Sequence, residues 1–201
     1  MSFISKYFAN KFFKESVVNQ YGITEDPYYE NIPEAELGKK KKGSRRKRTA
    51  PPGISEHDAQ VLHKVLRRAH YLEMCLGSIC GVRMGWGSVI GLIPFVGDII
   101  AGYLGAMVID LAKTVDGGLP LWLQMRMLTN LALDFGLGLI PIVGDAVDAV
   151  YKSNCRNALM LEAHLRKKGE KALRAHGVQP QPAPAPTDKR ASIARHGLDA
   201  R

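Results

Sequence analysis

The strongest constraint on the fold of this chain is an octapeptide that occurs twice. Gly-Leu-Ile-Pro-Phe-Val-Gly-Asp at 91–98 recurs as Gly-Leu-Ile-Pro-Ile-Val-Gly-Asp at 138–145, an offset of 47 residues, with seven of the eight positions identical. Such self-similarity indicates two like supersecondary units that pack together, each covering the apolar face of the other. Because proline disfavours the helical conformation in the preceding residue, we expect each unit to be a helix, a break at the Ile-Pro, and a new helix that begins near the Gly-Asp.

The repeat supplies a first set of candidate site residues. They are its glycines, prolines and aspartates: Gly91, Pro94, Gly97, Asp98, Gly138, Pro141, Gly144 and Asp145. Each aspartate follows a glycine just after the expected break, where a carboxylate caps the first amides of the next helix. The alternatives are that the paired aspartates bind an ion, relay a proton or form a catalytic pair. An intramembrane aspartyl protease requires a GxGD sequence, and Phe95 and Ile142 stand where its first glycine should be.

Two amphipathic helices are predicted on either side of this repeat. The first begins at Ser55, whose side chain can cap first-turn amides, and Glu56 and Asp58 suit the positive end of its dipole. Its apolar stripe is Val61, Leu62, Val65, Leu66, Ala69, Leu72 and Leu76. The second runs from about Ala146 to Leu173. Between the first helix and the repeat, glycines four residues apart favour close packing of helix backbones.

The N-terminal region combines an aromatic amphipathic segment with a strongly basic run. Residues 3–18 predict a helix that either anchors to a membrane interface, or targets mitochondria, or docks on the protein's own core. The run from Lys39 to Arg48 reads as a solvated, disordered linker that can also bind anionic headgroups or serve as a nuclear address. Its candidate lipid-binding residues are Lys39, Lys40, Lys41, Lys42, Arg45, Arg46, Lys47 and Arg48.

These segments divide the chain into three parts. Residues 1–54 hold the N-terminal amphipathic helix and the basic linker, residues 55–175 form a helical repeat domain, and residues 176–201 are a disordered Pro-rich tail. The predicted fold class is all-α, with tandem-repeat helical hairpins made of proline-broken, glycine-rich apolar helices between disordered basic and Pro-rich tails. Three irregularly spaced cysteines indicate neither a disulfide framework nor a zinc site.

Charge and hydropathy favour contact with a membrane. The net charge is +9, yet residues 84–150 carry −4, so the flanks carry +13. A basic exterior around an apolar centre suits an anionic membrane, although nucleic-acid binding also predicts basic flanks. The segment from Ser88 to Ala112 is long enough to span a hydrocarbon core of about 30 Å, but a central aspartate and a proline make insertion energetically marginal. The segment also suits buried helices of a soluble bundle, although we favour the membrane, where the positive-inside rule would leave both termini in the cytosol.

The two octapeptides, together with residues between and after them, resemble the family known as domain of unknown function 4112. The resemblance covers residues 65–167 and includes Arg126-Met127-Leu128, Asn130, Asp134, Asp148, Lys152, Asn154, Arg156-Asn157 and Leu161-Glu162. It implies a small helical protein, often predicted to span membranes, with no assigned activity. The long basic extensions favour a fungal origin. The family's first repeat also has an aspartate four residues before its GLIP glycine, where this chain has Gly87. Candidate functional polar residues are Arg126, Asn130, Asp134, Asp148, Lys152 and Arg156.

The function expected from these features is non-enzymatic. We expect a membrane-associated scaffold or small integral membrane protein, without a cofactor, whose partners are anionic lipid headgroups. Self-association through glycine-rich helix faces is a further expectation. An ion or small-solute transport component is the first alternative, and a soluble nuclear or nucleic-acid-binding helical protein is the second, although nucleic acid is the less expected partner.

Overall fold

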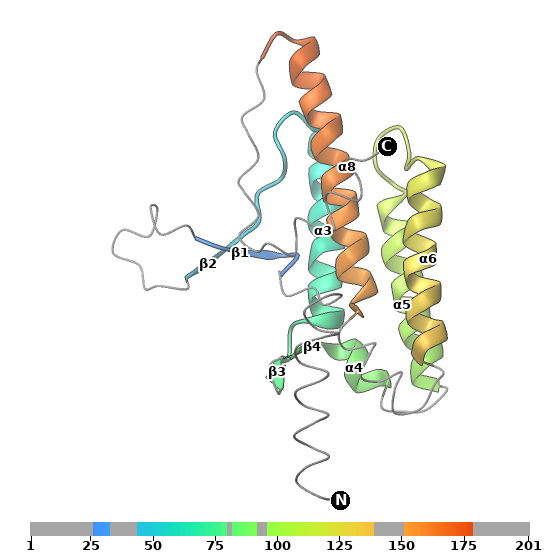
Figure 1. The fold of residues 1–201 in the computed structure, drawn as a ribbon. Coiled ribbons are helices and arrows are strands. Elements are labelled where there is room, and N and C mark those ends of the chain that lie inside the picture. Colours follow the sequence, from blue (N-terminus) through green and yellow to red (C-terminus); the bar gives the residue numbers. More distant parts are fainter. Residues whose placement is uncertain (1–25, 33–43, 80–81, 92–95, 139–150, 179–201) are drawn as a thin grey trace, which may run out of the picture.

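The computed structural model describes residues 26–32, 44–79, 82–91, 96–138 and 151–178 (Figure 1). Several predictions fall outside these ranges: the N-terminal helix, the Pro-rich tail, Lys39 to Lys42, and Pro94, Pro141, Gly144, Asp145 and Asp148. The described elements are β1 Tyr29–Asn31, β2 Arg45–Lys47, α3 Glu56–Glu73, β3 Gly77–Ile79, β4 Val82–Met84, α4 Trp86–Gly91, α5 Val96–Ala112, α6 Leu121–Gly138 and α8 Ser153–Ala175. The protein is mostly helical, as predicted, and two short antiparallel hairpins, β1–β2 and β3–β4, are additions to that prediction.

Helix α3 forms as its sequence indicates. The Ser55 side chain accepts a hydrogen bond of 3.1 Å from the Asp58 amide, which satisfies one of the unpaired amides of the first turn. The predicted stripe points inward: Val61, Leu62, Val65, Leu66 and Ala69 are all buried. Leu76, by contrast, lies beyond the helix and is exposed.

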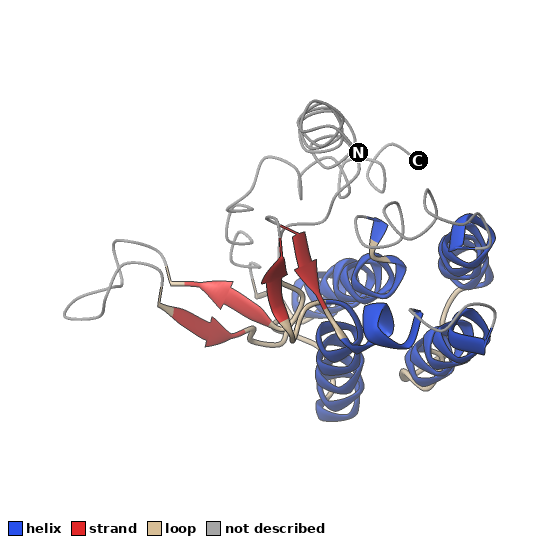
Figure 2. Ribbon diagram, turned by 90° about the horizontal axis from the view of Figure 1, so that it is seen from below, coloured by secondary structure: helices blue, strands red, loops and turns tan. Residues whose placement is uncertain are grey.

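The long helices form two layers (Figures 1 and 2). Helices α3 and α8 lie side by side in one layer, and α5 and α6 form the other; α5 packs on both α3 and α8, whereas α6 packs on α8. The core between the layers is aliphatic and includes Leu62, Val65, Leu123, Met127 and Leu161, each almost fully buried. Full burial of one such side chain is worth about 1.5–3 kcal/mol, so the interface between the layers supplies much of the stability.

The helix boundaries coincide with the duplicated octapeptide. Helix α4 ends at Gly91 and α5 begins at Val96, and the residues between them, which include Pro94, lie outside the described ranges. Helix α6 ends at Gly138, the residue equivalent to Gly91. Figure 1 places α4, the start of α5 and the end of α6 at the same end of the bundle.

The segment considered as a membrane span, Ser88 to Ala112, contains the end of α4 and the whole of α5. Residues 92–95 between these two helices lie outside the described ranges, so the predicted break at Pro94 stays a prediction. Among the described residues, no helix combines the length and the apolarity needed to cross a bilayer.

The C-terminal helix begins later than predicted. Residues 146–150 are outside the described ranges, and Lys152 has φ +50° and ψ +64°, a left-handed conformation that a continuous α-helix cannot contain. Helix α8 therefore begins at Ser153 and continues to Ala175. This corrects the prediction of one helix from Ala146 to Leu173.

Two glycines of the predicted close-packing segment lie against the end of α3. A Cβ atom on Gly85 would be 2.3 Å from the Leu72 carbonyl oxygen, and one on Gly87 would be 2.9 Å from the same oxygen. Only glycine allows the chain to approach the α3 backbone this closely. These two glycines therefore serve contacts inside the chain.

Candidate functional site

The described part of the basic run is a β-strand. Strand β2 pairs with β1 in antiparallel register, with Glu30 opposite Arg46, and Arg46 Nε donates a 2.6 Å hydrogen bond to Glu30 Oε1. Lys47 places its ammonium group 5.8 Å from the centre of the Tyr28 ring. The prediction of a disordered linker is wrong for residues 45–47, because these contacts hold the strand against an acidic and aromatic partner. Their side chains remain exposed.

Arg48 differs from the rest of the basic run because it is buried. Its Nη1 donates a 3.2 Å hydrogen bond to Glu162 Oε2 on α8, and its Nε donates one of 3.2 Å to the Asp26 carbonyl oxygen. The exposed fractions of the Arg48 and Glu162 side chains are both 6%. Arg48 therefore holds the hairpin to α8, which corrects its assignment as a lipid-binding residue.

The β1–β2 hairpin and the α5–α6 layer lie on opposite sides of the α3–α8 layer. Figures 1 and 2 show this arrangement from two directions. A flat surface that contacts the outer side of α6 would therefore not meet Arg45, Arg46 and Lys47.

Several of the predicted polar residues meet between α6 and α8. Asn130 donates through Nδ2 to Asn157 Oδ1 at 2.9 Å and accepts through Oδ1 from the Tyr151 hydroxyl at 3.0 Å. Asn157 is fully buried and donates to the Met127 carbonyl oxygen at 3.1 Å. The amide side chains thus join the middle of α6 to the first two turns of α8.

A second group of contacts continues this network toward the start of α8. The Ser153 hydroxyl donates to Asp134 Oδ2 at 2.5 Å. Arg156 donates through Nε to the Tyr151 carbonyl oxygen at 2.7 Å, and its guanidinium carbon lies 4.6 Å from the centre of the Tyr151 ring. Lys152, between these residues, is buried. The predicted residues Asn130, Asp134, Lys152 and Arg156 therefore gather in one region, whereas Arg126 lies exposed on α6.

Glu73, which sequence reasoning did not select, caps the start of α8. Its two carboxylate oxygens accept hydrogen bonds from the amides of Asn154, at 2.6 Å, and Cys155, at 2.9 Å. Burial raises the pKa of Glu73, and the hydrogen bonds to Cys155 and Asn154 oppose that rise. Burial also raises the pKa of the Cys155 thiol well above its ordinary value, so this cysteine is held as an unreactive thiol.

The network between α3, α6 and α8 is built for packing. Its carboxylates and amides bond to backbone amides, hydroxyls and other side chains of the same chain. Hydrogen-bonded polar groups of this kind fix how helices meet, because each would cost free energy if it lost its partner in a buried place. Within the described residues, the buried Asn154 Oδ1 has no hydrogen-bond partner.

One histidine and two aspartates have the spacing of a metal site. His57, Asp58 and Asp116 bring ligand atoms within 4.8 Å of one another. However, Lys168 Nζ lies 2.7 Å from Asp58 Oδ2 and 2.5 Å from the Asp116 carbonyl oxygen. The Lys168 ammonium group therefore supplies the positive charge at this place and joins α8 to α3 and to the α5–α6 connection.

Two residues of the first octapeptide, Gly97 and Asp98, lie in the first turn of α5 and differ in burial. Gly97 is buried, and Asp98 is the third residue of the helix and half-buried. Because the helix begins at Val96, Asp98 lies in the first turn and not at the capping position that the sequence predicted. A carboxylate there still complements the positive end of the helix dipole.

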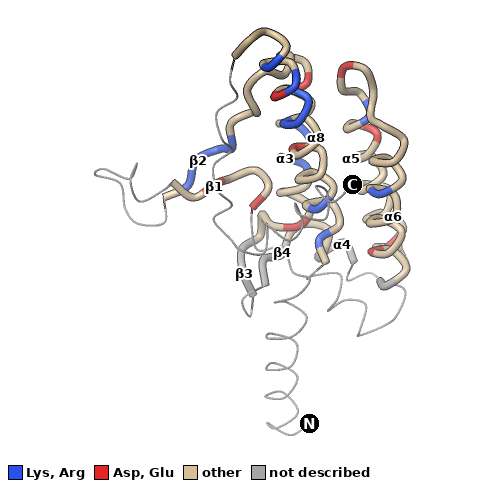
Figure 3. The backbone as a smooth tube through the Cα atoms, turned by 45° about the horizontal axis from the view of Figure 1, so that its top comes forward, with Lys and Arg blue, Asp and Glu red and all other residues tan. Residues whose placement is uncertain are grey.

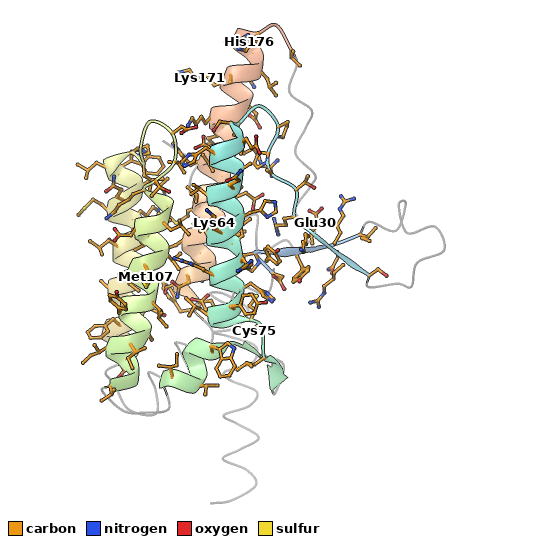
Figure 4. The ribbon with its side chains drawn as sticks, turned by 180° about the vertical axis from the view of Figure 1, so that it is seen from behind. Glu30, Lys64, Cys75, Met107, Lys171 and His176 are labelled. Atoms are coloured by element: carbon orange, nitrogen blue, oxygen red, sulfur yellow. The ribbon has the colours of Figure 1, made fainter. Side chains whose placement is uncertain are left out.

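An apolar surface covers the outer side of α5 and α6. Helix α5 buries residues such as Val108 and Ile109 on its inner side, and α6 buries Leu123 and Met127. Their outer sides expose large apolar side chains instead, a set that Figure 4 draws and in which it labels Met107. The exposed residues are Val96, Ile99, Ile100, Tyr103 and Met107 of α5 and Leu121, Trp122, Met125, Leu128, Leu133 and Phe135 of α6. We call this set the apolar outer face.

Charged residues are distributed in the opposite way. Figure 3 shows Lys and Arg mainly on β2, α3 and α8, whereas α5 and α6 carry few charged positions. Large exposed apolar patches on otherwise polar proteins mark sites of contact with another protein or with a membrane. The apolar outer face is therefore the candidate functional site.

Fold and surface together define a small two-layer helical protein with one apolar outer layer and a basic remainder. The chain belongs to the family described as domain of unknown function (DUF4112), whose model matches residues 61–165. It is 24% identical over 159 residues to the uncharacterized membrane protein YLR326W of Saccharomyces cerevisiae, a match that covers 78% of this chain and 62% of the relative. This fungal relative is consistent with the fungal origin expected from the basic extensions. No solved structure matches the chain.

Sequence reasoning found part of the polar network but not the apolar outer face as a surface. The family motif pointed to Asn130, Asp134 and Arg156. Helix α5 is apolar on nearly every side, so its sequence does not show which side is covered. Only the packing of its inner side on α3 and α8 leaves the outer side exposed.

Proposed function

We propose that this protein is a non-enzymatic, membrane-associated scaffold that lies on a bilayer surface and inserts its apolar outer face into the headgroup and acyl boundary. The observation that carries the proposal is the exposure of Ile99, Tyr103 and Trp122, at 64%, 65% and 54%. The likeness to a yeast membrane protein supports the same environment.

The composition of this face suits a membrane interface. Tyr103 and Trp122 have amphipathic rings, which favour the level of the headgroups, and Ile99, Met125 and Leu128 provide apolar area. Full transfer of one such side chain out of water is worth about 1.5–3 kcal/mol, so a few of them together stabilise reversible attachment.

The polar network supports a structural role for the motif residues between α6 and α8. Asn130 and Asn157 hold α6 on α8, and Glu73 holds the start of α8 on α3. Together with the packing of α5 on α6, these contacts keep the two helices in one layer, so that their outer sides form one surface. In this proposal the paired repeats form the hairpin core, and both termini remain in the cytosol.

Binding to vesicles tests the proposal. The full chain is mixed with phosphatidylcholine vesicles, with or without phosphatidylserine, and floated through a density gradient. Wild type should float with vesicles, and the variant Ile99→Ser/Tyr103→Ser should remain at the bottom. Leu76→Ser/Val178→Ser is the matched control, because it removes two exposed apolar side chains outside the face. Failure of the wild type to float with either vesicle would overturn the proposal.

A further inference from the structure

Helix α3 carries an exposed row of basic side chains. Lys64, Arg67 and Arg68 are all exposed, and their spacing of three and four residues places them on one side of the helix. None of them forms an ion pair with an acidic side chain in the part of the chain that the structure describes. We call these three residues the α3 cation row.

The α3 cation row lies beside the helix that carries half of the apolar outer face. Helix α3 packs directly on α5, and the two run in opposite directions, because the Asp116 amide just after α5 donates to Asp58 near the start of α3 at 2.7 Å. Figure 4 labels Lys64 on α3 and Met107 on α5, in neighbouring helices of the same view.

The other sides of α3 are covered. Val61 and Val65 point into the core, and His63 and His70 face the Tyr28 ring of the hairpin segment, with ring centres 6.3 Å and 6.1 Å apart. The cation row therefore occupies the outer side of α3, between the hairpin and α5. A surface that accepts the α5 side chains would meet these cations at its margin.

This placement fits an anionic bilayer by charge. Lysine and arginine can extend their charged ends to the phosphate level while apolar neighbours insert more deeply. By contrast, Arg46 is paired with Glu30 and Lys47 lies over Tyr28, and both lie on the far side of the bundle from α6.

We infer that the α3 cation row is a binding site for anionic phospholipid headgroups, which gives the membrane contact of the α5–α6 layer its lipid preference. The inference rests on the proposed function and adds residues to it that the polybasic run does not contain. It identifies the lipid by its chemistry: a phosphate-bearing headgroup with net negative charge in a bilayer.

The test compares two double variants of equal charge. Lys64→Gln/Arg68→Gln removes two cations of the row, and Lys171→Gln/Arg174→Gln removes two exposed cations near the far end of α8. Affinity of the full chain is measured for vesicles of phosphatidylcholine alone and mixed with phosphatidylserine. One surface cation is worth about fivefold in affinity for an anionic membrane. We therefore expect about a 25-fold loss on mixed vesicles for the first variant, a much smaller loss for the second, and no change for either on neutral vesicles.

Several outcomes would overturn this inference while leaving the proposed function standing. Equal losses for both variants would mean that net charge alone is sensed. Unchanged binding of the α3 variant to mixed vesicles would exclude the row as a headgroup site. A loss of binding to duplex DNA, without any loss on vesicles, would assign the row to nucleic acid. The conservative variant Lys64→Arg/Arg68→Lys should bind as wild type does, and circular dichroism of each variant checks that the fold is retained.

Discussion

Arg48 and Glu162, 114 residues apart in sequence, form a buried ion pair that fastens the end of strand β2 to helix α8. Glu162 also accepts a 2.8 Å hydrogen bond from Arg166, one turn further along α8. The buried Glu162 carboxylate is thus paired with one cation from the same helix, Arg166, and with Arg48, the residue that follows strand β2.

Replacing Arg48 with alanine should destabilise the protein, because the buried Glu162 carboxylate would lose one of its two cationic partners and keep only Arg166. Breaking a buried pair costs about 3–5 kcal/mol, and the remaining Arg166 contact places the expected loss near the lower figure. Chemical denaturation measures the free energy of unfolding. Arg46→Ala is the control, since it breaks an exposed pair with Glu30 and should cost less than about 1 kcal/mol.

Replacing Glu73 with alanine should loosen the start of α8. Two amides, those of Asn154 and Cys155, would lose their acceptor, at a cost of about 1–3 kcal/mol for buried donors left without a partner. Hydrogen exchange should accelerate at these two amides first. Glu170→Ala, further along α8, should leave their exchange rates unchanged; equal acceleration in both variants would contradict the capping role.

The stability of the protein should fall in acid through Asp26. Burial favours the neutral acid, but hydrogen bonds from His70 and from the amides of Tyr29 and Tyr28 outweigh it and hold the pKa of Asp26 well below its ordinary value of 3.8. A lowered pKa in the folded state gives stability that is present above the unfolded value and is lost as the pH falls below it.

The variant Asp26→Asn isolates this contribution. It should unfold more easily than wild type at neutral pH, and the difference should shrink as the pH falls below about 4. Thermal unfolding at a series of pH values measures it. A difference that stays constant down to the most acid conditions would show that the charge of Asp26 does not contribute.

Replacing Asn157 with alanine should weaken the contact between α6 and α8. The change removes the acceptor used by Asn130 and the donor to the Met127 carbonyl oxygen, and the site is fully buried. We expect a loss of about 2–3 kcal/mol, visible as a lower melting temperature. Thr129→Ala is the control, because Thr129 is exposed and its hydroxyl donates to the carbonyl of Met125 in its own helix; it should change stability little.

Local signals in the sequence were enough for some elements and not for others. Helix α3 was predicted with its cap and its buried stripe, because Ser55 and the apolar spacing act within a few residues. The β1–β2 hairpin was missed because its strands are far apart in sequence: Arg46, for example, pairs with Glu30, 16 positions earlier. No local rule indicates such a partner for a basic run.

The candidate site shows the same division. The family motif pointed to Asn130, Asp134 and Arg156, which do lie close together. The start of α8 was predicted too early, because nothing in the apolar and basic pattern of the sequence indicates the left-handed backbone at Lys152. Exposure of Tyr103 and Trp122 depends on which sides of α5 and α6 pack inward, which is a property of the assembled layers.

The duplicated octapeptide follows a helix of six residues in its first copy and one of 18 residues in its second. A substitution at Gly91 thus acts at the end of the short helix α4, which packs on α3. The equivalent substitution at Gly138 acts at the end of the long helix α6, which bears Trp122 and Phe135. The two nearly identical octapeptides therefore have different structural surroundings, and the same substitution in each of them should have different effects.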